Sequence, residues 1–439
     1  MLSKMKIAFK TFGCRLNISE TESLISLLPD NFDLITDFNE ADIVIINSCT
    51  VTAEAEKKCI HFINPLINKG KICILTGCFN PYPFFSDDQL LYIPLFNKSK
   101  VIDCLNSLNI DKNLVLTNLK SSNFLLENGH ENRFLPPSTK KEFHSRAFLK
   151  IQDGCNNRCT YCKVCLVRGK SISLQDDIII ERIKKLKNSG FSEIILTGIN
   201  IAAYSYNGVT FSYLLEKLID IFPDLIFQLS SIEIINLDSK FFEVITLENI
   251  KPYFHLPLQS GSDNILKLMN RRYTVNDFIK TIENIKKIRD DSFISTDVIV
   301  GFPGESLKTI SETEVLVRKL GFEHLHIFPF SKREGTAAYN FTETFSEKEK
   351  SLHIESLRKI SNANKNKYIN SYIGKQDKMC IESIKKLNNA KYLITGKSYH
   401  SIQCLVLTND IKDLKIGQYI KVKFFGKIGY KLYGILNEN

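Results

Sequence analysis

The chain has 439 residues, of which 44% are hydrophobic and 24% charged, and its formal charge at pH 7 is +10. At roughly 100 to 200 residues per domain, this length predicts two to four domains with an ample core. The hydrophobic fraction excludes a disordered chain, and no apolar stretch approaches the roughly 18 to 20 residues that span a bilayer. The N-terminus lacks the pattern of a signal peptide, so we expect a cytoplasmic protein without membrane contacts.

Residues 1–120 alternate short β-type runs with helical patterns, as in KIAFKTF, FDLIT, DIVIINS and KICILTG. This alternation predicts a parallel sheet covered by helices, including helices near residues 20–28 and 53–68. Cys14, Cys49 and Cys78 each follow one of these runs. Because open α/β sheets bind ligands at the carboxyl ends of their strands, the three thiols are predicted to converge on one site.

Residues 121–143 lose periodicity and contain Pro136 and Pro137, which predicts a linker. Residues 144–370 then hold six apolar runs separated by helical stretches, and end in a charged helix that begins near Ser346. Six such units predict a parallel (β/α) barrel or an open, partial version of one. The four main helices are expected at 176–188, 211–221, 275–288 and 307–320.

Residues 371–439 form a basic tail with twelve lysines, no arginine and five acidic residues. Its β-type runs have glycines at the expected turns, which predicts a small β-barrel. The lysines predict a surface that binds a polyanion. Tyrosines interleave with them and could stack on bases, although tyrosines in a small barrel more often belong to its core; they are Tyr392, Tyr399, Tyr419 and Tyr430.

The clearest motif is CNNRCTYC, which follows the first strand of the barrel region and holds Cys155, Cys159 and Cys162. Twelve cysteines in a reducing compartment do not indicate a disulfide framework. Three thiolates on one tight loop can instead hold three irons of a [4Fe-4S] cluster and leave the fourth iron open. The alternative is a zinc knuckle, with Cys165 as the fourth ligand, or three packed cysteines.

The chain resembles the radical S-adenosylmethionine (SAM) methylthiotransferases, which combine an N-terminal cluster domain, a radical SAM core and a C-terminal TRAM domain. The similar blocks cover nearly the whole chain in the family's order; they are TFGCRLNISETES, INSCTVT, LTGC, RAFLKIQDGCNNRCTYC, RGKSIS, ILTGINIAAY, LSSIE, LQSGSDNILKLMNRRYT, TDVIVGFPGE and HIFPFSKREGTAA. The resemblance implies two [4Fe-4S] clusters. The ligands would be Cys155, Cys159 and Cys162 for the SAM cluster, and Cys14, Cys49 and Cys78 for the auxiliary cluster.

Cys165 departs from the family pattern, because these families usually have a proline shortly before the Arg-Gly pair. It is interpreted as a small apolar residue in the loop lining, with a spare, oxidation-prone thiol as the alternative. Five other cysteines fall inside helix or strand patterns and are predicted to serve packing alone; they are Cys59, Cys73, Cys104, Cys380 and Cys404.

Polar residues at the ends of the barrel strands are the candidate SAM contacts. Such positions face the mouth of a barrel, where sites form, and the resemblance implies that some of them bind SAM. The alternative for each is ordinary solvation of a strand end. The candidates are Thr197, Gly198 and Asn200 after the second strand, Ser230, Ser231 and Glu233 after the third, Gln259 and Ser260 after the fourth, and Asp297 in the fifth.

The resemblance is greatest to tRNA enzymes that convert N6-threonylcarbamoyladenosine at position 37 to its 2-methylthio form. One SAM would methylate a sulfur on the auxiliary cluster, and a second would supply a radical that activates C2 of the base. That base lies in the single-stranded anticodon loop, so the enzyme can splay it into the barrel without unpairing it. The expected partners are tRNA, rather than DNA, and an electron donor protein.

Two other functions stay open. A related methylthiotransferase could act on isopentenyl-adenosine or on a ribosomal-protein aspartate, although the FGCRLN and FSKREGTAA blocks are more similar to the threonylcarbamoyl branch. A non-catalytic, metal-stabilised RNA-binding protein is the second alternative. Counting iron distinguishes this RNA-binding protein from a methylthiotransferase, because two clusters hold about eight irons and a zinc module holds none.

Overall fold

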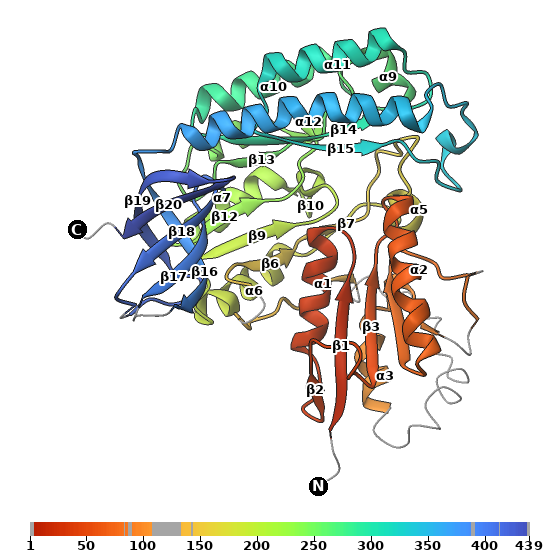
Figure 1. Cartoon of the computed structure of the whole chain (residues 1–439), viewed down its shortest axis with the longest axis vertical. Coiled ribbons are helices and arrows are strands. Elements are labelled where there is room, and N and C mark those ends of the chain that lie inside the picture. The colour runs from red at the N-terminus through yellow and green to blue at the C-terminus, as the bar shows by residue number, and fades with distance from the viewer. Residues whose placement is uncertain are drawn as a thin grey trace.

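A computed structural model of the chain describes residues 4–82, 84–86, 90–107, 133–141, 144–387, 391–411 and 413–436. Figure 1 shows three successive regions: an N-terminal sheet, a central set of strands with helices around it, and a C-terminal barrel. This architecture confirms the predicted fold class. Most of the predicted linker at 121–143 lies outside the described residues. No helix in the described ranges combines the length and apolar character needed to cross a bilayer.

The N-terminal region is a parallel sheet with strand order β2-β1-β3-β4-β5. Helix α1 begins at Arg15, earlier than the sequence pattern indicated, because the extended backbone of Cys14 caps it directly after β1. The elements are β1 (Met5–Thr11), α1 (Arg15–Ser26), β2 (Phe32–Leu34), β3 (Ile43–Ser48), α2 (Ala53–Asn68), β4 (Ile72–Gly77), β5 (Leu91–Tyr92), η1 (Leu95–Asn97) and α3 (Lys100–Ser107).

The central region contains the six predicted parallel strands. They form two three-stranded sheets, β6-β9-β12 and β13-β14-β15, which isolated bridges between Phe227 and Ile250 and between Ser231 and His255 join into an open barrel. The strands are β6 (Ala147–Lys150), β9 (Glu193–Thr197), β12 (Ile226–Leu229), β13 (Tyr253–His255), β14 (Phe293–Val300) and β15 (His324–Pro329).

Helices pack on the outer face of this barrel, where one large hydrophobic core lies. The four main helices have the predicted bounds: α6 (Asp176–Asn188), α7 (Phe211–Ile221), α10 (Val275–Ile288) and α11 (Leu307–Leu320). The charged helix is α12 (Glu347–Asn370). The connections hold β7 (Gln152–Asp153), α5 (Val164–Arg168), β8 (Ile172–Ser173), η3 (Ile201–Ala203), β10 (Ser205–Tyr206), β11 (Val209–Thr210), η4 (Ile234–Asn236), α8 (Ser239–Val244), α9 (Asp263–Leu268) and η5 (Ala337–Asn340).

The C-terminal region is a closed barrel of order β16-β17-β18-β20-β19, which confirms the small β-barrel. Two of the four tyrosines considered for base stacking form hydrogen bonds with the central region instead. The hydroxyl of Tyr399 donates to the carbonyl of Glu248 at 2.7 Å, and that of Tyr419 donates to Glu193 at 2.5 Å. The strands are β16 (Gln376–Lys386), β17 (Tyr392–Ser398), β18 (Gln403–Thr408), β19 (Tyr419–Ile428) and β20 (Lys431–Leu436).

His400 joins this barrel to the central region and makes their contact sensitive to pH. Its Nδ1 lies 2.8 Å from Asp377 and its Nε2 lies 3.1 Å from Asp291. Burial lowers the pKa of His400, but the hydrogen bonds to Asp291 and Asp377 outweigh it and raise that pKa above the ordinary 6.5. The stabilisation is therefore complete below pH 6.5 and is lost as the pH rises through the raised value.

Between pH 6 and pH 9 we expect the free energy of unfolding of the wild type to fall by on the order of 1 kcal/mol more than that of His400→Asn. Urea titrations of both proteins at the two pH values measure this difference. Equal losses would show that His400 does not carry the pH dependence.

Candidate functional site

The three N-terminal cysteines lie at the ends of three neighbouring strands, with Cys14 after β1, Cys49 after β3 and Cys78 after β4. Gly13 has a φ of +101°, and a Cβ there would lie 2.5 Å from the Cβ of Cys49, so the close approach of these segments requires glycine. Burial raises the pKa of Cys49 to about 12, and the neighbouring Cys14 and Cys78 add to this shift. The structure therefore brings the three thiols together at one edge of the sheet.

The second cysteine set lies on the loop between β7 and α5. A Cβ at Gly154, whose φ is +71°, would collide with the carbonyl oxygen of Lys170, so only glycine lets the loop turn here. Cys159 is buried, whereas Cys155 and Cys162 are partly exposed. Burial, with Cys159 nearby, raises the pKa of Cys162 to about 12. Such thiols ionise when a metal replaces the proton.

Sulfur spacing tests which metal group these residues fit. Tetrahedral zinc, with Zn–S distances near 2.3 Å, holds its ligand sulfurs about 3.8 Å apart. Among the described residues, neither cysteine set has three ligand atoms within 4.8 Å of one another. In a [4Fe-4S] cluster each thiolate binds a different iron, so its ligand sulfurs need not lie this close together. The spacing of each set therefore differs from that of a zinc knuckle, and its three thiols are the donor type that an iron–sulfur cluster uses.

A buried arginine that the sequence did not single out connects the two sets. Arg168, on α5, donates from Nε to the sulfur of Cys78 at 3.2 Å. Its other nitrogens donate to Glu20 at 3.0 Å and to Asp153 at 3.1 Å, and Asp153 lies two residues before Cys155. One guanidinium thus contacts one of the N-terminal thiols, Cys78, and Asp153 at the start of the cysteine loop.

Glu20 of α1 lies at the centre of this buried charge network. Lys150 of β6 donates to it at 2.8 Å, and Lys98 and Arg168 also pair with it. Burial raises the pKa of Glu20, but these three positive charges outweigh it and hold that pKa well below its usual range. Because an unpaired buried charge costs several kcal/mol, the network fixes the N-terminal sheet against the barrel.

The candidates after β9 lie beside the cysteine loop. Thr197 is buried at the end of β9, and a Cβ at Gly198 would lie 2.8 Å from the carbonyl oxygen of Gln152. The backbone N–H of Asn200 donates to the side-chain oxygen of Gln152 at 2.9 Å. Since Gln152 belongs to β7, which leads directly into the loop, Gly198 and Asn200 lie against the strand that precedes the cysteines.

Glu233 is held next to the loop by an arginine. Arg271 forms an ion pair with Glu233 and donates to the sulfur of Cys159 at 3.3 Å. The arginine thus links a candidate SAM contact to a candidate cluster ligand. The sequence analysis did not identify Arg271, although it lies in the MNRRYT part of a family-like block.

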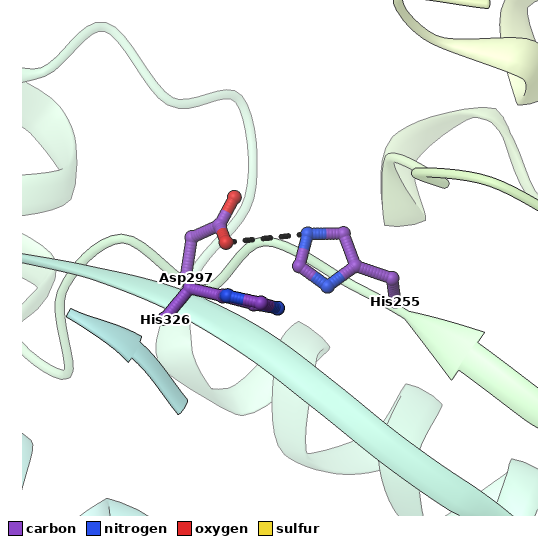
Figure 2. A group of neighbouring side chains, drawn as sticks. All are labelled: His255, Asp297 and His326. Atoms are coloured by element: carbon purple, nitrogen blue, oxygen red, sulfur yellow. Dashed lines mark ion pairs between the residues drawn. The ribbon is translucent and has the colours of Figure 1, made fainter. Parts of the chain in front are cut away.

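The remaining candidates divide between the strand ends and the inner face of the barrel. Ser230, Ser231, Gln259 and Ser260 lie at or just beyond the ends of β12 and β13, and Gln259 adopts a φ of +68°. Asp297 instead lies within β14, where it pairs with His255 at 3.2 Å. Figure 2 shows His255, Asp297 and His326 pointing toward one another.

Cys165 contacts Cys155 through a side-chain hydrogen bond, which lowers the pKa of Cys165 to about 6. We expect Cys165→Ala and Cys165→Pro to keep the full iron content, because the three loop cysteines already supply the ligands of one cluster. Iron counts on anaerobically purified variants measure this. A loss of iron in both variants would make Cys165 a ligand.

Comparison with known proteins places the chain in a family. The family model described as Radical SAM superfamily matches residues 149–317, and the model described as Uncharacterized protein family UPF0004 matches residues 6–83. The threonylcarbamoyladenosine tRNA methylthiotransferase MtaB of Thermotoga maritima is 32% identical over 80% of this chain and 81% of its own length. The tRNA-2-methylthio-N(6)-dimethylallyladenosine synthase of Fervidobacterium nodosum is 34% identical over 77% of this chain and 78% of its own length.

Solved structures agree with the fold. The radical SAM methyltransferase TsrM of Kitasatospora setae has a TM-score of 0.52 at 11% identity, covering 76% of this chain and 77% of its own. The cobalamin-dependent radical enzyme OxsB has a TM-score of 0.51 at 14% identity, covering 83% of this chain and 56% of its own. These likenesses concern the fold alone, whereas the sequence relatives cover most of the chain at about a third identity. The chain therefore belongs to the radical SAM tRNA methylthiotransferase family.

Proposed function

We propose that this chain methylthiolates C2 of N6-threonylcarbamoyladenosine at position 37 in the anticodon loop of tRNA. Its relatives from five bacteria carry the name threonylcarbamoyladenosine tRNA methylthiotransferase, at 29 to 32% identity. A relative named for dimethylallyladenosine reaches 34%, so overall identity does not separate the two substrates. The FGCRLN and FSKREGTAA blocks favour the threonylcarbamoyl branch.

Membership of the family implies a [4Fe-4S] cluster and SAM as cofactors. We further propose that the chain holds two clusters, one on Cys155, Cys159 and Cys162 and an auxiliary one on Cys14, Cys49 and Cys78. When bound, these groups would supply radical cleavage of SAM and the sulfur to be transferred. The observation that carries this proposal is the guanidinium of Arg168, which contacts Cys78 and, through Asp153, the start of the cysteine loop.

The chain's own residues would position these groups and the substrate. Arg271 orients Cys159 and Glu233 together, and Arg168 and Glu20 hold the N-terminal sheet over the barrel. Asp297 on the inner face of the barrel and the strand-end residues would bind SAM; the strand-end residues are Thr197, Gly198, Asn200, Ser231, Glu233, Gln259 and Ser260.

The domain boundaries proposed for this mechanism are 1–120 for the auxiliary-cluster domain, 144–370 for the radical SAM core and 371–439 for a TRAM-like domain. The lysines of the last domain would contact tRNA phosphates. An electron donor protein would reduce the SAM cluster, and tRNA substrates place the reaction in the cytoplasm.

Reconstituted enzyme distinguishes the two branches. Anticodon stem-loops that carry either N6-threonylcarbamoyladenosine or isopentenyl-adenosine are incubated with SAM and a reductant, then digested to nucleosides for mass spectrometry. We expect the methylthio product from the threonylcarbamoyl stem-loop. Product from the isopentenyl stem-loop alone would contradict the proposal.

A further inference from the structure

Polar side chains gather on the inner face of β13, β14 and β15. Side chains alternate in direction along a strand, and Phe254, Ile294 and Leu325 belong to the hydrophobic core on the outer face. Their neighbours therefore point to the inner face. A ligand that reaches this face meets hydrogen-bonding and charged groups; they are Tyr253 and His255 of β13, Ser295 and Asp297 of β14, and His324 and His326 of β15.

Two cations from different regions converge on Tyr253. The guanidinium carbon of Arg15, from α1, lies 5.3 Å from the centre of the tyrosine ring, and Nζ of Lys397, from β17, lies 5.9 Å from it. Burial lowers the pKa of Lys397 to about 7, and the positive charges around it, Arg15 included, add to this shift. In the described part of the chain, no carboxylate forms an ion pair with Arg15 or Lys397.

Among the described residues, Arg15 has one hydrogen-bond acceptor, the side chain of Gln228. With the Gln228 amide oriented to satisfy both of its atoms, its oxygen accepts from Arg15 at 3.1 Å and its nitrogen donates to Glu193 at 3.0 Å. Glu193 is already paired with Lys251 at 3.0 Å. A guanidinium has five N–H donors, so Arg15 can still bind an anion.

Three side chains of this face form a group of metal-binding ligand types. His255, Asp297 and His326 offer ligand atoms within 4.8 Å of one another, as Figure 2 shows. Burial lowers the pKa of His326 and the neighbouring His255 lowers it further, while Asp297 raises it; Arg15 and Lys365 make smaller contributions that lower it. Zinc binding by this group is therefore included in the test below.

We infer that Arg15 binds the carboxylate of the threonylcarbamoyl group and thereby selects the substrate base. The inference rests on the proposed function, whose substrate carries a carboxylate on its N6 substituent. A guanidinium binds a carboxylate through two parallel hydrogen bonds. An isopentenyl group is uncharged and would cover the guanidinium without pairing with it, which is unfavourable. Because Arg15 directly follows Cys14, this contact would hold the base next to the thiols assigned to the auxiliary cluster.

Neutralising either partner tests this contact. The substrates are stem-loops with N6-threonylcarbamoyladenosine, with its carboxamide analogue, and with unmodified adenosine. The proteins are the reconstituted wild type, Arg15→Gln, Arg15→Lys and Arg318→Gln; the last makes the same substitution at an exposed residue of α11. Iron content and SAM cleavage without tRNA are measured on every sample, because Arg15 lies beside Cys14.

We expect the wild type to prefer the carboxylate over the carboxamide by about 30-fold in kcat/KM, equivalent to roughly 2 kcal/mol. Arg15→Gln should lose this preference, Arg15→Lys should keep part of it, and Arg318→Gln should keep all of it. If Arg15→Gln loses iron, the Arg15→Lys protein, with its iron intact, replaces it in the test. A partial loss of the carboxylate preference in Arg15→Lys then supports the inference, and an unchanged preference contradicts it.

Three results would overturn the inference. The first is a carboxylate preference that survives in Arg15→Gln. The second is equal weakening of Arg15→Gln binding to all three stem-loops, which would assign Arg15 to a tRNA phosphate. The third is a zinc ion bound by the wild type and lost in His326→Ala. A wild type that modifies only isopentenyl-adenosine would contradict the proposed function itself. This outcome is distinct from the three results that overturn only the role of Arg15.

Discussion

Replacing Cys49 with alanine should remove about half of the bound iron and all methylthiolation, while reductive cleavage of SAM continues. Cys49 follows β3 in the N-terminal sheet, whereas the cysteine loop belongs to the barrel region. With four irons per cluster, loss of one cluster of two leaves about half. The radical-forming group would then be intact, and only the sulfur source would be missing. Iron counts, 5'-deoxyadenosine yield and modified nucleosides are measured on one anaerobic sample.

Cys73→Ala is the matched control for Cys49→Ala. Cys73 lies in β4 of the same sheet and is also buried, but it belongs to the hydrophobic core. The Cys73→Ala protein should have a lower free energy of unfolding, because packing is lost, and should keep its full iron content. If Cys49→Ala behaves like this control, or still methylthiolates tRNA, the two-cluster mechanism is wrong for this protein.

Replacing Cys159 with alanine should abolish SAM cleavage and leave the N-terminal iron in place. Cys159 is the buried member of the loop, and Arg271 donates a hydrogen bond to its sulfur. Losing one of three thiolates leaves an iron without its protein ligand, so the cluster that binds SAM should not persist. Anaerobic assays of 5'-deoxyadenosine, together with iron counts, measure both effects.

Cys404→Ala is the control for Cys159→Ala, because Cys404 is fully buried in the C-terminal barrel, away from both cysteine sets. It should retain SAM cleavage. Formation of 5'-deoxyadenosine by Cys159→Ala would exclude Cys159 as a ligand of the SAM cluster.

Local pattern was enough to predict much of the fold. The bounds of α6, α7, α10 and α11 follow from apolar residues at helical spacing, and the six barrel strands follow from short β-type runs between them. The placement of Cys14, Cys49 and Cys78 at one edge needed only the rule that parallel strands end together. The short helices α5, α8 and α9 were missed, because five or six residues carry too little periodicity.

Contacts between distant residues were not predictable in this way. Arg168 reaches Glu20 and Cys78, which are far away in the sequence, and nothing in the residues around it indicates these partners. Arg15 of the N-terminal region similarly lies over Tyr253 of the central region, which Lys397 of the C-terminal barrel also approaches. Asp297 was predicted inside the fifth strand, in the inward-facing polar set, and it does lie within β14, where it pairs with His255.

Nucleoside analysis of tRNA from a strain that lacks this gene tests the central claim most directly. The account predicts that 2-methylthio-N6-threonylcarbamoyladenosine disappears and its precursor accumulates, and that the wild-type gene, but not a Cys159→Ala copy, restores the product. Unchanged levels of this nucleoside, or loss of the methylthio derivative of isopentenyl-adenosine instead, would contradict it.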